Sequence, residues 1–129
     1  MKKLKHLSKE WIEALDSTAK SHKDFLLAIS DIQLLLEYRI IDEEEICWQI
    51  NIQNGSVEIS LNNSKKPDVW FETSRMSAVL FLEGKIDPLQ AVMDGTLNMG
   101  GDPRKLLEAS KIFEQLEDIF KTIREITIT

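Results

Sequence analysis

The residue types that most often carry out chemistry are few and scattered in this chain. His6 and His22 lie in the N-terminal segment, and neither stands at metal-ligand spacing from the other or from Cys47, so we expect both on the surface. Cys47 falls on the polar side of an alternating segment, where no neighbouring base is evident to activate its thiol. The acidic run at residues 42–45 lacks the alternating ligands and the glycine of a calcium loop. We therefore expect no enzymatic activity, no catalytic residues, no metal site and no cofactor.

A glycine pair, Gly100 and Gly101, offers a further site to consider. Asp102 and Pro103 follow it and are typical of a helix start, and backbone amides at such a position can hold a phosphate. Asp102 is expected to cap these amides itself, and its charge would repel an anion. We therefore interpret the glycine pair as structural.

Composition indicates a single domain spanning residues 1–129, with residues 1–7 frayed. The chain is 43% apolar and 29% charged, which is ordinary for a globular protein. Its net charge of −6 makes nucleic acid a poor partner. Residues 1–23 nevertheless carry six lysines against three acidic residues, so at most a peripheral contact with an anionic membrane is expected there.

Three observations bear on the compartment. No stretch approaches the ~18 apolar residues that a transmembrane helix requires. The first basic residues are not followed by the continuous apolar segment of a secretory signal. One cysteine cannot form an internal disulfide and is typical of a reducing compartment. We expect a cytoplasmic protein.

Alternation of apolar and polar residues predicts a sheet. Residues 32–41 and 46–53 alternate with a period of two, and residues 57–61 continue the pattern. Asn54 and Gly55 separate the second and third strands, and this pair is the strongest signal for a two-residue hairpin. One face of these strands is apolar and the other mostly polar, so helices need to cover one side only.

The rest of the chain adds two strands. The polar loop at residues 62–67 is long enough to cross to a non-adjacent position in the sheet. Residues 69–73 read as the fourth strand, and Leu97 and Met99 fit a short fifth one. The prediction is an α+β fold with a five-stranded, mixed and mainly antiparallel sheet covered on one face by helices.

Helical periodicity accounts for the remaining segments. The predicted helices cover residues 8–20, 25–29, 74–84, 87–95 and 103–125. Their predicted N-caps, apart from that of the second, are Ser8, Ser74, Asp87 and Asp102. In the third helix, Met76, Val79 and Leu80 form the expected inward stripe. The last helix carries an apolar stripe wider than about 100°.

These apolar helix faces can form a plain core or leave room for an apolar ligand. Met76 and Met93 belong to these helices and Met99 to the short fifth strand, and flexible thioethers suit adaptable apolar surfaces. Pockets between helices and a sheet are common sites for such ligands. The expected ligand-lining residues are Met76, Val79, Leu80, Val92, Met93, Met99, Leu106, Phe113, Leu116 and Phe120.

One stretch resembles a known family. The matching pattern reads GKIDPLQAVMDGTLNMGGD and begins at Gly84. Its matching positions are Gly84, Lys85, Asp87, Pro88, Gly95, Leu97, Gly101 and Asp102. In these residues and in the order of its elements the chain resembles the sterol carrier protein family, in its single-domain prokaryotic form.

The resemblance implies an apolar tunnel between the sheet and the helices. It further implies non-catalytic binding or transfer of a sterol-like lipid, a fatty acid, an acyl-CoA or an isoprenoid. Other members act as accessory subunits of quinone-synthesising or other enzymes. The alternative function is therefore an interaction module that docks a lipid- or quinone-metabolising enzyme, or forms a homodimer, through its apolar helix face.

Overall fold

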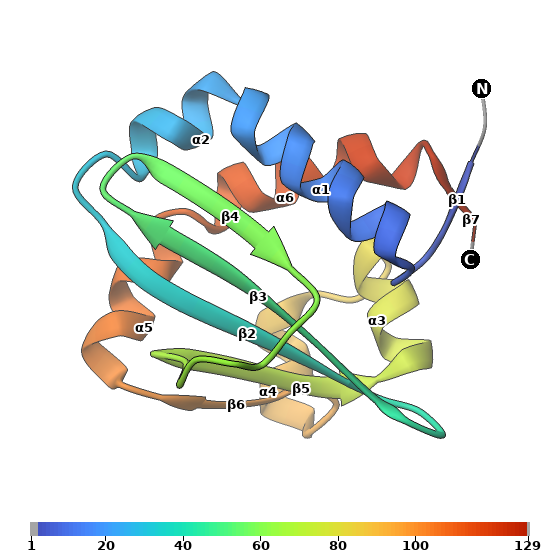
Figure 1. Cartoon of the computed structure of the whole chain (residues 1–129). Coiled ribbons are helices and arrows are strands. Elements are labelled where there is room, and N and C mark those ends of the chain that lie inside the picture. Colours follow the sequence, from blue (N-terminus) through green and yellow to red (C-terminus); the bar gives the residue numbers. More distant parts are fainter. Residues whose placement is uncertain (1–2, 129) are drawn as a thin grey trace.

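The computed structural model describes residues 3–128, and at residues 88 and 89 it describes the backbone alone. Along the chain the elements are β1 (Leu4–Lys5), α1 (Lys9–Ser21), α2 (Lys23–Ala28), β2 (Gln33–Ile41), β3 (Glu45–Gln53), β4 (Ser56–Ser60), β5 (Val69–Ser74), α3 (Arg75–Leu82), α4 (Pro88–Asp94), β6 (Asn98–Gly101), α5 (Pro103–Ser110), α6 (Phe113–Arg124) and β7 (Thr127–Ile128). Figure 1 shows the larger sheet in front, with the helices behind it and along its upper edge.

Strands β2 to β6 form the larger sheet, in the order β4-β3-β2-β5-β6. All neighbours in it are antiparallel except β2 and β5, which are parallel. Asn54 and Gly55 connect β3 to β4 with φ angles of 45° and 94°, as predicted for a two-residue hairpin. The segment 61–68 then crosses the sheet, so that β5 pairs with β2 and not with β4. The predicted α+β fold with a mixed, mainly antiparallel sheet is confirmed.

The crossing segment covers part of the outer, polar face of the sheet. Gln49 donates a hydrogen bond to the carbonyl oxygen of Lys65 at 2.8 Å and another to Glu37 at 2.9 Å. Glu37 also accepts a hydrogen bond from Arg39 at 2.6 Å. Glu37 and Gln49 are each only 3% exposed, and these bonds compensate for their burial.

The inner face of the sheet holds the apolar core. Leu36 at its centre pairs with Ile50 on one side and Val69 on the other, and all three are buried. Helix α1 packs along β4, and α6 packs against α1, α2 and α3. The inner face thus faces a helical layer, as the alternation of β2 and β3 predicts.

The N-terminal residues differ from the expected frayed segment. Leu4–Lys5 forms β1, which pairs in parallel with β7 at the other end of the chain. His6 and Leu7 follow it and are both buried, so the expectation of a surface position for His6 is wrong. Leu7 belongs to the apolar core, and burial of its side chain holds this segment against the rest of the fold. Residues 1 and 2 of the expected frayed segment lie outside the described residues.

The last predicted helix is broken into α5 and α6. The chain leaves helical geometry at Ile112, which has φ −109° and ψ 0°. Helix α5 packs on β2 and β6, whereas α6 packs on α1, α2 and α3. One straight helix cannot direct its apolar stripe at both surfaces. The prediction of a single helix over residues 103–125 is therefore wrong. The apolar residues continue through the break, so the periodicity gave no sign of it.

Candidate ligand-binding cavity

A cavity of about 1000 Å³ lies between the inner face of the sheet and the helical layer. The sheet forms its floor, α3 forms one wall, and α5 and α6 form the opposite wall. The connection from α3 to α4 borders it at the surface. Such a volume is at the upper end of the range for small-molecule pockets.

The floor of the cavity is aromatic. Tyr38 of β2 is the direct cross-strand partner of Trp48 on β3 and of Phe71 on β5. The Tyr38 ring is nearly parallel to the Trp48 ring, with centroids 4.3 Å apart and an angle of 9°. The Tyr38 and Phe71 centroids are 5.2 Å apart at 29°. The β-strand alternation therefore gathers three rings on one patch of the sheet.

The walls continue this apolar lining. Phe113 at the start of α6 packs edge-on toward Phe71, with centroids 6.3 Å apart. Phe120, two turns further along α6, packs edge-on toward Trp48 at 6.3 Å. Helix α3 contributes Phe81 from the opposite side. The cavity is therefore enclosed mainly by aromatic and aliphatic side chains.

Charged residues are confined to the surface end of the cavity. Lys85 borders the opening, and its ammonium lies 3.4 Å from the Glu83 carboxylate. Asp87, Glu114 and Glu117 also border it and are exposed. Glu117 is paired with Arg124 at 3.7 Å, so Asp87 and Glu114 give the opening its excess of negative charge.

The N-terminal residues border the cavity away from this charged rim. His6, Leu7 and Trp11 contribute to the lining, and all three are buried. Burial, and secondarily the positive charge of Arg75, lowers the pKa of His6 from 6.5 to about 4. His6 is therefore neutral at pH 7.

The structure distributes the predicted lining residues unevenly. Those that border the cavity are Val92, Met99, Leu106, Phe113, Leu116 and Phe120. Those that do not are Met76, Val79, Leu80 and Met93. Met76 and Met93 point to solvent and are 77% and 75% exposed.

Helix α3 is rotated relative to the expected inward stripe. Ala78, Phe81 and Leu82 face the cavity in place of Met76, Val79 and Leu80. Both triplets have the same i, i+3, i+4 spacing, and α3 is apolar on almost every side. Periodicity alone therefore could not choose between the two faces.

Sequence reasoning missed the floor and the N-terminal contribution. Tyr38 and Trp48 lie on predicted strands but are absent from the predicted lining, although their alternation puts them on the apolar face. Their direct pairing depends on the register between β2 and β3, which are joined by the acidic turn at residues 42–44, and no turn signal in that segment indicates the register. For His6 and Leu7 no local signal exists, because their burial follows from pairing with the far end of the chain.

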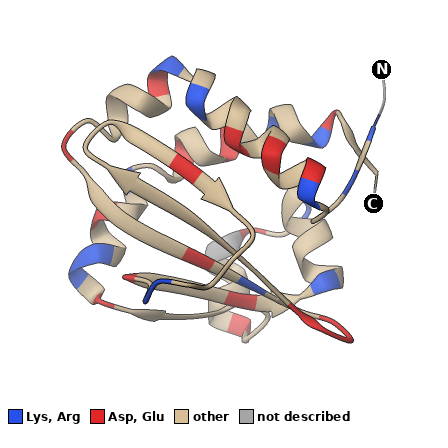
Figure 2. Ribbon diagram, viewed as in Figure 1, with Lys and Arg blue, Asp and Glu red and all other residues tan. Residues whose placement is uncertain are grey.

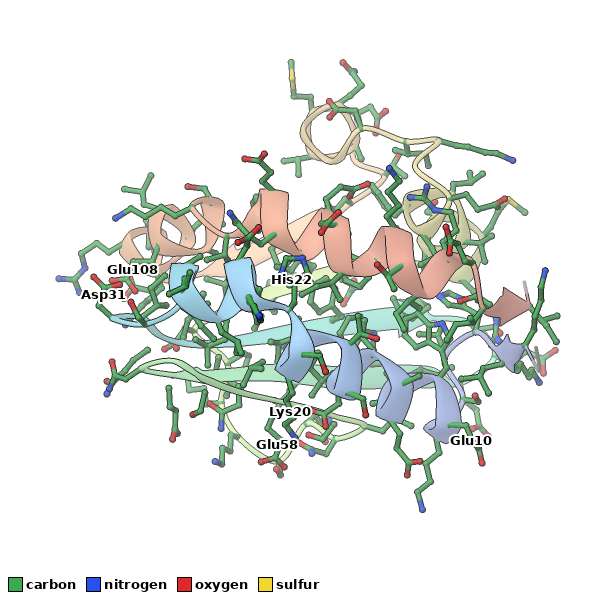
Figure 3. The ribbon with its side chains drawn as sticks, turned by 90° about the horizontal axis from the view of Figure 1, so that it is seen from above. Glu10, Lys20, His22, Asp31, Glu58 and Glu108 are labelled. Atoms are coloured by element: carbon green, nitrogen blue, oxygen red, sulfur yellow. The ribbon has the colours of Figure 1, made fainter. Side chains whose placement is uncertain are left out.

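The remaining polar candidates have structural roles. His22 accepts a hydrogen bond at Nδ1 from the Phe25 amide at 3.0 Å and thereby caps α2. Its Nε2 then carries the proton and lies 2.6 Å from the Asp118 carboxylate of α6. Figure 3 shows His22 where α1 meets α2, facing α6. This histidine holds the helices together.

Cys47 is not activated as a nucleophile. Burial, followed by the nearby charges of Glu45 and Glu37, raises the pKa of its thiol to about 11. The thiol therefore stays protonated at pH 7, and the thiolate is the reactive form.

Neither the acidic run nor the glycine pair forms an ion site. The acidic turn between β2 and β3 projects from the sheet (Figure 2), and Asp42 pairs with Arg75 at 3.2 Å. Gly100 lies against the Trp70 ring, where a Cβ would come within 2.5 Å of the indole, and Asp102 caps α5. Among residues 3–128, no group of three or more His, Cys, Asp or Glu side chains could hold a metal ion.

Comparison with known proteins identifies the family. The sequence profile of the SCP-2 sterol transfer family matches residues 6–114. The chain therefore belongs to the SCP-2 sterol transfer family. No curated protein matches the chain significantly in sequence. Within the described part of the chain, no helix is both long and apolar enough to cross a membrane.

Solved structures share the fold at low identity. A Thermus thermophilus protein described as a candidate sterol carrier protein superposes with a TM-score of 0.72 at 15% identity, covering 100% of this chain and 94% of that one. A crystal structure of sterol carrier protein 2 gives 0.71 at 17%, covering 94% and 98%. A UbiJ-SCP2 ubiquinone synthesis protein gives 0.57 at 12%, covering 86% and 88%. At these identities the likeness concerns the fold alone.

Proposed function

We propose that this protein binds a lipid or another hydrophobic molecule, without catalysing a reaction, in the cavity between its sheet and its helices. The observation that carries the proposal is the apolar lining of a cavity of about 1000 Å³. Burial of an alkyl or isoprenoid chain there would stabilise the complex by roughly 0.8 kcal/mol per CH₂. Membership of the SCP-2 sterol transfer family supports this function. The ligand classes considered are sterol-like lipids, fatty acids, acyl-CoAs and isoprenoids.

The two aliphatic hydroxyl groups of the described lining, those of Ser110 and Thr73, favour binding over catalysis. Ser110 donates its hydroxyl hydrogen bond to the Leu107 carbonyl oxygen at 2.7 Å. Thr73 donates to the Thr96 carbonyl oxygen at 2.9 Å. Neither hydroxyl has the neighbouring base that an activated nucleophile requires.

A direct test is mass spectrometry of a solvent extract from gently purified protein, together with its native mass. The expected result is one lipid class at close to one molecule per chain. Because a ligand can be lost during purification, empty protein is also titrated with the neutral fluorescent probe N-phenyl-1-naphthylamine. Failure both to retain a lipid and to take up this probe contradicts the proposal.

Phe113→Asp should reduce lipid binding at least tenfold. Phe113 is the first residue of α6, is 39% exposed and borders the cavity. An aspartate in the first turn of a helix is favourable, so the variant should fold while placing a charge in the apolar wall. Leu27→Asp is the matched control, because Leu27 is exposed on α2 and lies outside the lining. Equal binding by both variants would argue against the cavity.

The second candidate function is an interaction module. Met76, Met93 and Leu107 expose large apolar side chains on α3, α4 and α5, and such side chains occur at protein interfaces. The UbiJ-SCP2 ubiquinone synthesis protein that shares the fold is compatible with an accessory role beside an enzyme. A native mass corresponding to a homodimer or a stable hetero-complex, with no extractable lipid, would favour this function.

A further inference from the structure

The aromatic floor presents a hydroxyl group to the cavity. Neighbouring strands lie about 4.8 Å apart, and Tyr38 stacks nearly face to face with its cross-strand partner Trp48 at 4.3 Å. Rings stacked along this direction stand upright on the sheet. The outer tip of the Tyr38 ring, which carries the hydroxyl, therefore points away from the strands toward the helices.

The Tyr38 hydroxyl has no hydrogen-bond partner among the described residues. Tyr38 borders the cavity and is only partly buried, and its oxygen is not among the fully covered polar atoms. Two other polar atoms of the lining, His6 Nδ1 and Trp48 Nε1, also lack a partner but are covered by neighbouring atoms. Of these three groups, the Tyr38 hydroxyl is the one that a ligand can reach without rearrangement.

The charges around the cavity oppose an anionic ligand group. A carboxylate next to Tyr38 would meet one hydroxyl, because Lys85 at the opening is the only Lys or Arg of the described lining, and burial of an unpaired charge is costly. At the opening it would meet Asp87 and Glu114, because Lys85 is already paired with Glu83 and Arg124 with Glu117. Fatty acids and acyl-CoAs are therefore disfavoured in either orientation.

We propose that the Tyr38 hydroxyl forms a hydrogen bond with an uncharged oxygen of the ligand, so that the cavity selects neutral lipids bearing a hydroxyl or carbonyl group. This inference rests on the proposed lipid-binding function and specifies its ligand class. Tyr38 anchors the oxygen at the floor, and the hydrocarbon part lies along Phe113 and Phe120.

The titration behaviour of Tyr38 agrees with this role. Burial raises the pKa of Tyr38 well above its usual value of 10. The phenol therefore keeps its proton and acts as both donor and acceptor. A ligand hydroxyl can donate a hydrogen bond to the phenol or accept one from it, whereas a ligand carbonyl oxygen can only accept one.

The test compares four ligands with one hydrocarbon skeleton. Oleyl alcohol, methyl oleate, oleic acid and cis-9-octadecene each compete with N-phenyl-1-naphthylamine for the full chain. The wild-type protein should bind the alcohol and the ester more tightly than the alkene, and the acid most weakly. Tyr38→Phe keeps the stacked ring and should weaken the alcohol and the ester by about 3- to 10-fold while leaving the alkene unchanged.

Ser21→Ala is the control, because it removes an exposed hydroxyl of α1 that lies outside the lining and is bonded to the Ser17 carbonyl oxygen. It should leave the ratio of alcohol to alkene affinity unchanged. If Tyr38→Phe also leaves this ratio unchanged, or if wild type prefers oleic acid, the Tyr38 inference is overturned while lipid binding stands. If wild type binds neither the probe nor any of the four ligands, the proposed function itself fails.

Discussion

His6 illustrates how one buried polar side chain constrains the protein. Its ring packs edge-on against Trp11, with centroids 4.9 Å apart and planes at 89°. Its Nδ1 is buried without a partner among the described residues. The backbone oxygen of His6 accepts a hydrogen bond from Arg75, and this places a positive charge nearby, partly balanced by Asp42. Such a site disfavours the charged imidazolium.

The stability of the protein should fall between pH 6.5 and pH 4 because of His6. Its pKa is about 4 in the folded state and 6.5 in the unfolded chain, so in this interval the unfolded chain binds more protons. Above pH 6.5 the neutral form of His6 makes its full contribution to the free energy of unfolding. As the pH falls toward 4 this contribution is lost, and the total loss is about 3 kcal/mol. The measurement is the free energy of unfolding in urea at several pH values.

His6→Phe isolates this contribution, since it keeps an aromatic ring against Trp11 and removes the titration. Its unfolding free energy should depend less on pH than that of wild type in the same interval. Parallel curves for the two proteins would show that His6 does not titrate as proposed.

At the scale of elements, edge strand β6 depends on close approach to β5. Gly101 has φ 116°, and a Cβ there would lie 2.1 Å from the Asp68 carbonyl oxygen. That same oxygen accepts the hydrogen bond from the Asp102 amide at 2.8 Å. The glycine therefore allows the backbone to reach the start of α5 without leaving the sheet.

Gly101→Ala should lower the free energy of unfolding by about 3 kcal/mol. The reason is steric, because the added methyl group meets rigid backbone rather than a flexible side chain. Gly95→Ala is the matched control: Gly95 also has positive φ, at 82°, but its Cβ would meet nothing within 4 Å. It should cost only about 1 kcal/mol. Equal losses in chemical denaturation would contradict the close approach.

At the scale of the whole molecule, the two ends of the chain close the fold together. Strand β1 pairs with β7, and Trp11 donates a hydrogen bond from its indole to the Thr127 hydroxyl at 2.9 Å. Thr127 in turn donates to the Ile123 carbonyl oxygen at 2.6 Å. Figure 1 shows β1 and β7 side by side, near α3. His6 and Leu7 follow β1 and border the cavity, so this closure holds them in place.

Thr127→Val should destabilise the protein by about 1–3 kcal/mol, because it leaves the buried Trp11 indole nitrogen without an acceptor at nearly constant volume. Thr122→Val on the exposed side of α6 provides the comparison and should change stability little. Thermal and urea unfolding of both variants measure the difference. If Thr127→Val is as stable as wild type, the termini contribute little to holding the fold together.

Local sequence signals determined most of the secondary structure. Alternation located β2 and β3, and the Asn54-Gly55 pair indicated the hairpin between β3 and β4. Ser8, Ser74, Asp87 and Asp102 cap helices as predicted. These signals succeed because strand alternation, turn geometry and capping depend on residues a few positions apart. The family resemblance rests on a short stretch of the same local kind.

Tertiary structure alone decided how these elements face one another. The rotation of α3, the break at Ile112 and the burial of His6 each depend on partners distant in the sequence. An apolar helix such as α3 buries similar area through either face, so its orientation follows from the surfaces that it meets. The sequence by itself therefore determined the kind of fold, and long-range packing decided which side chains enclose the cavity.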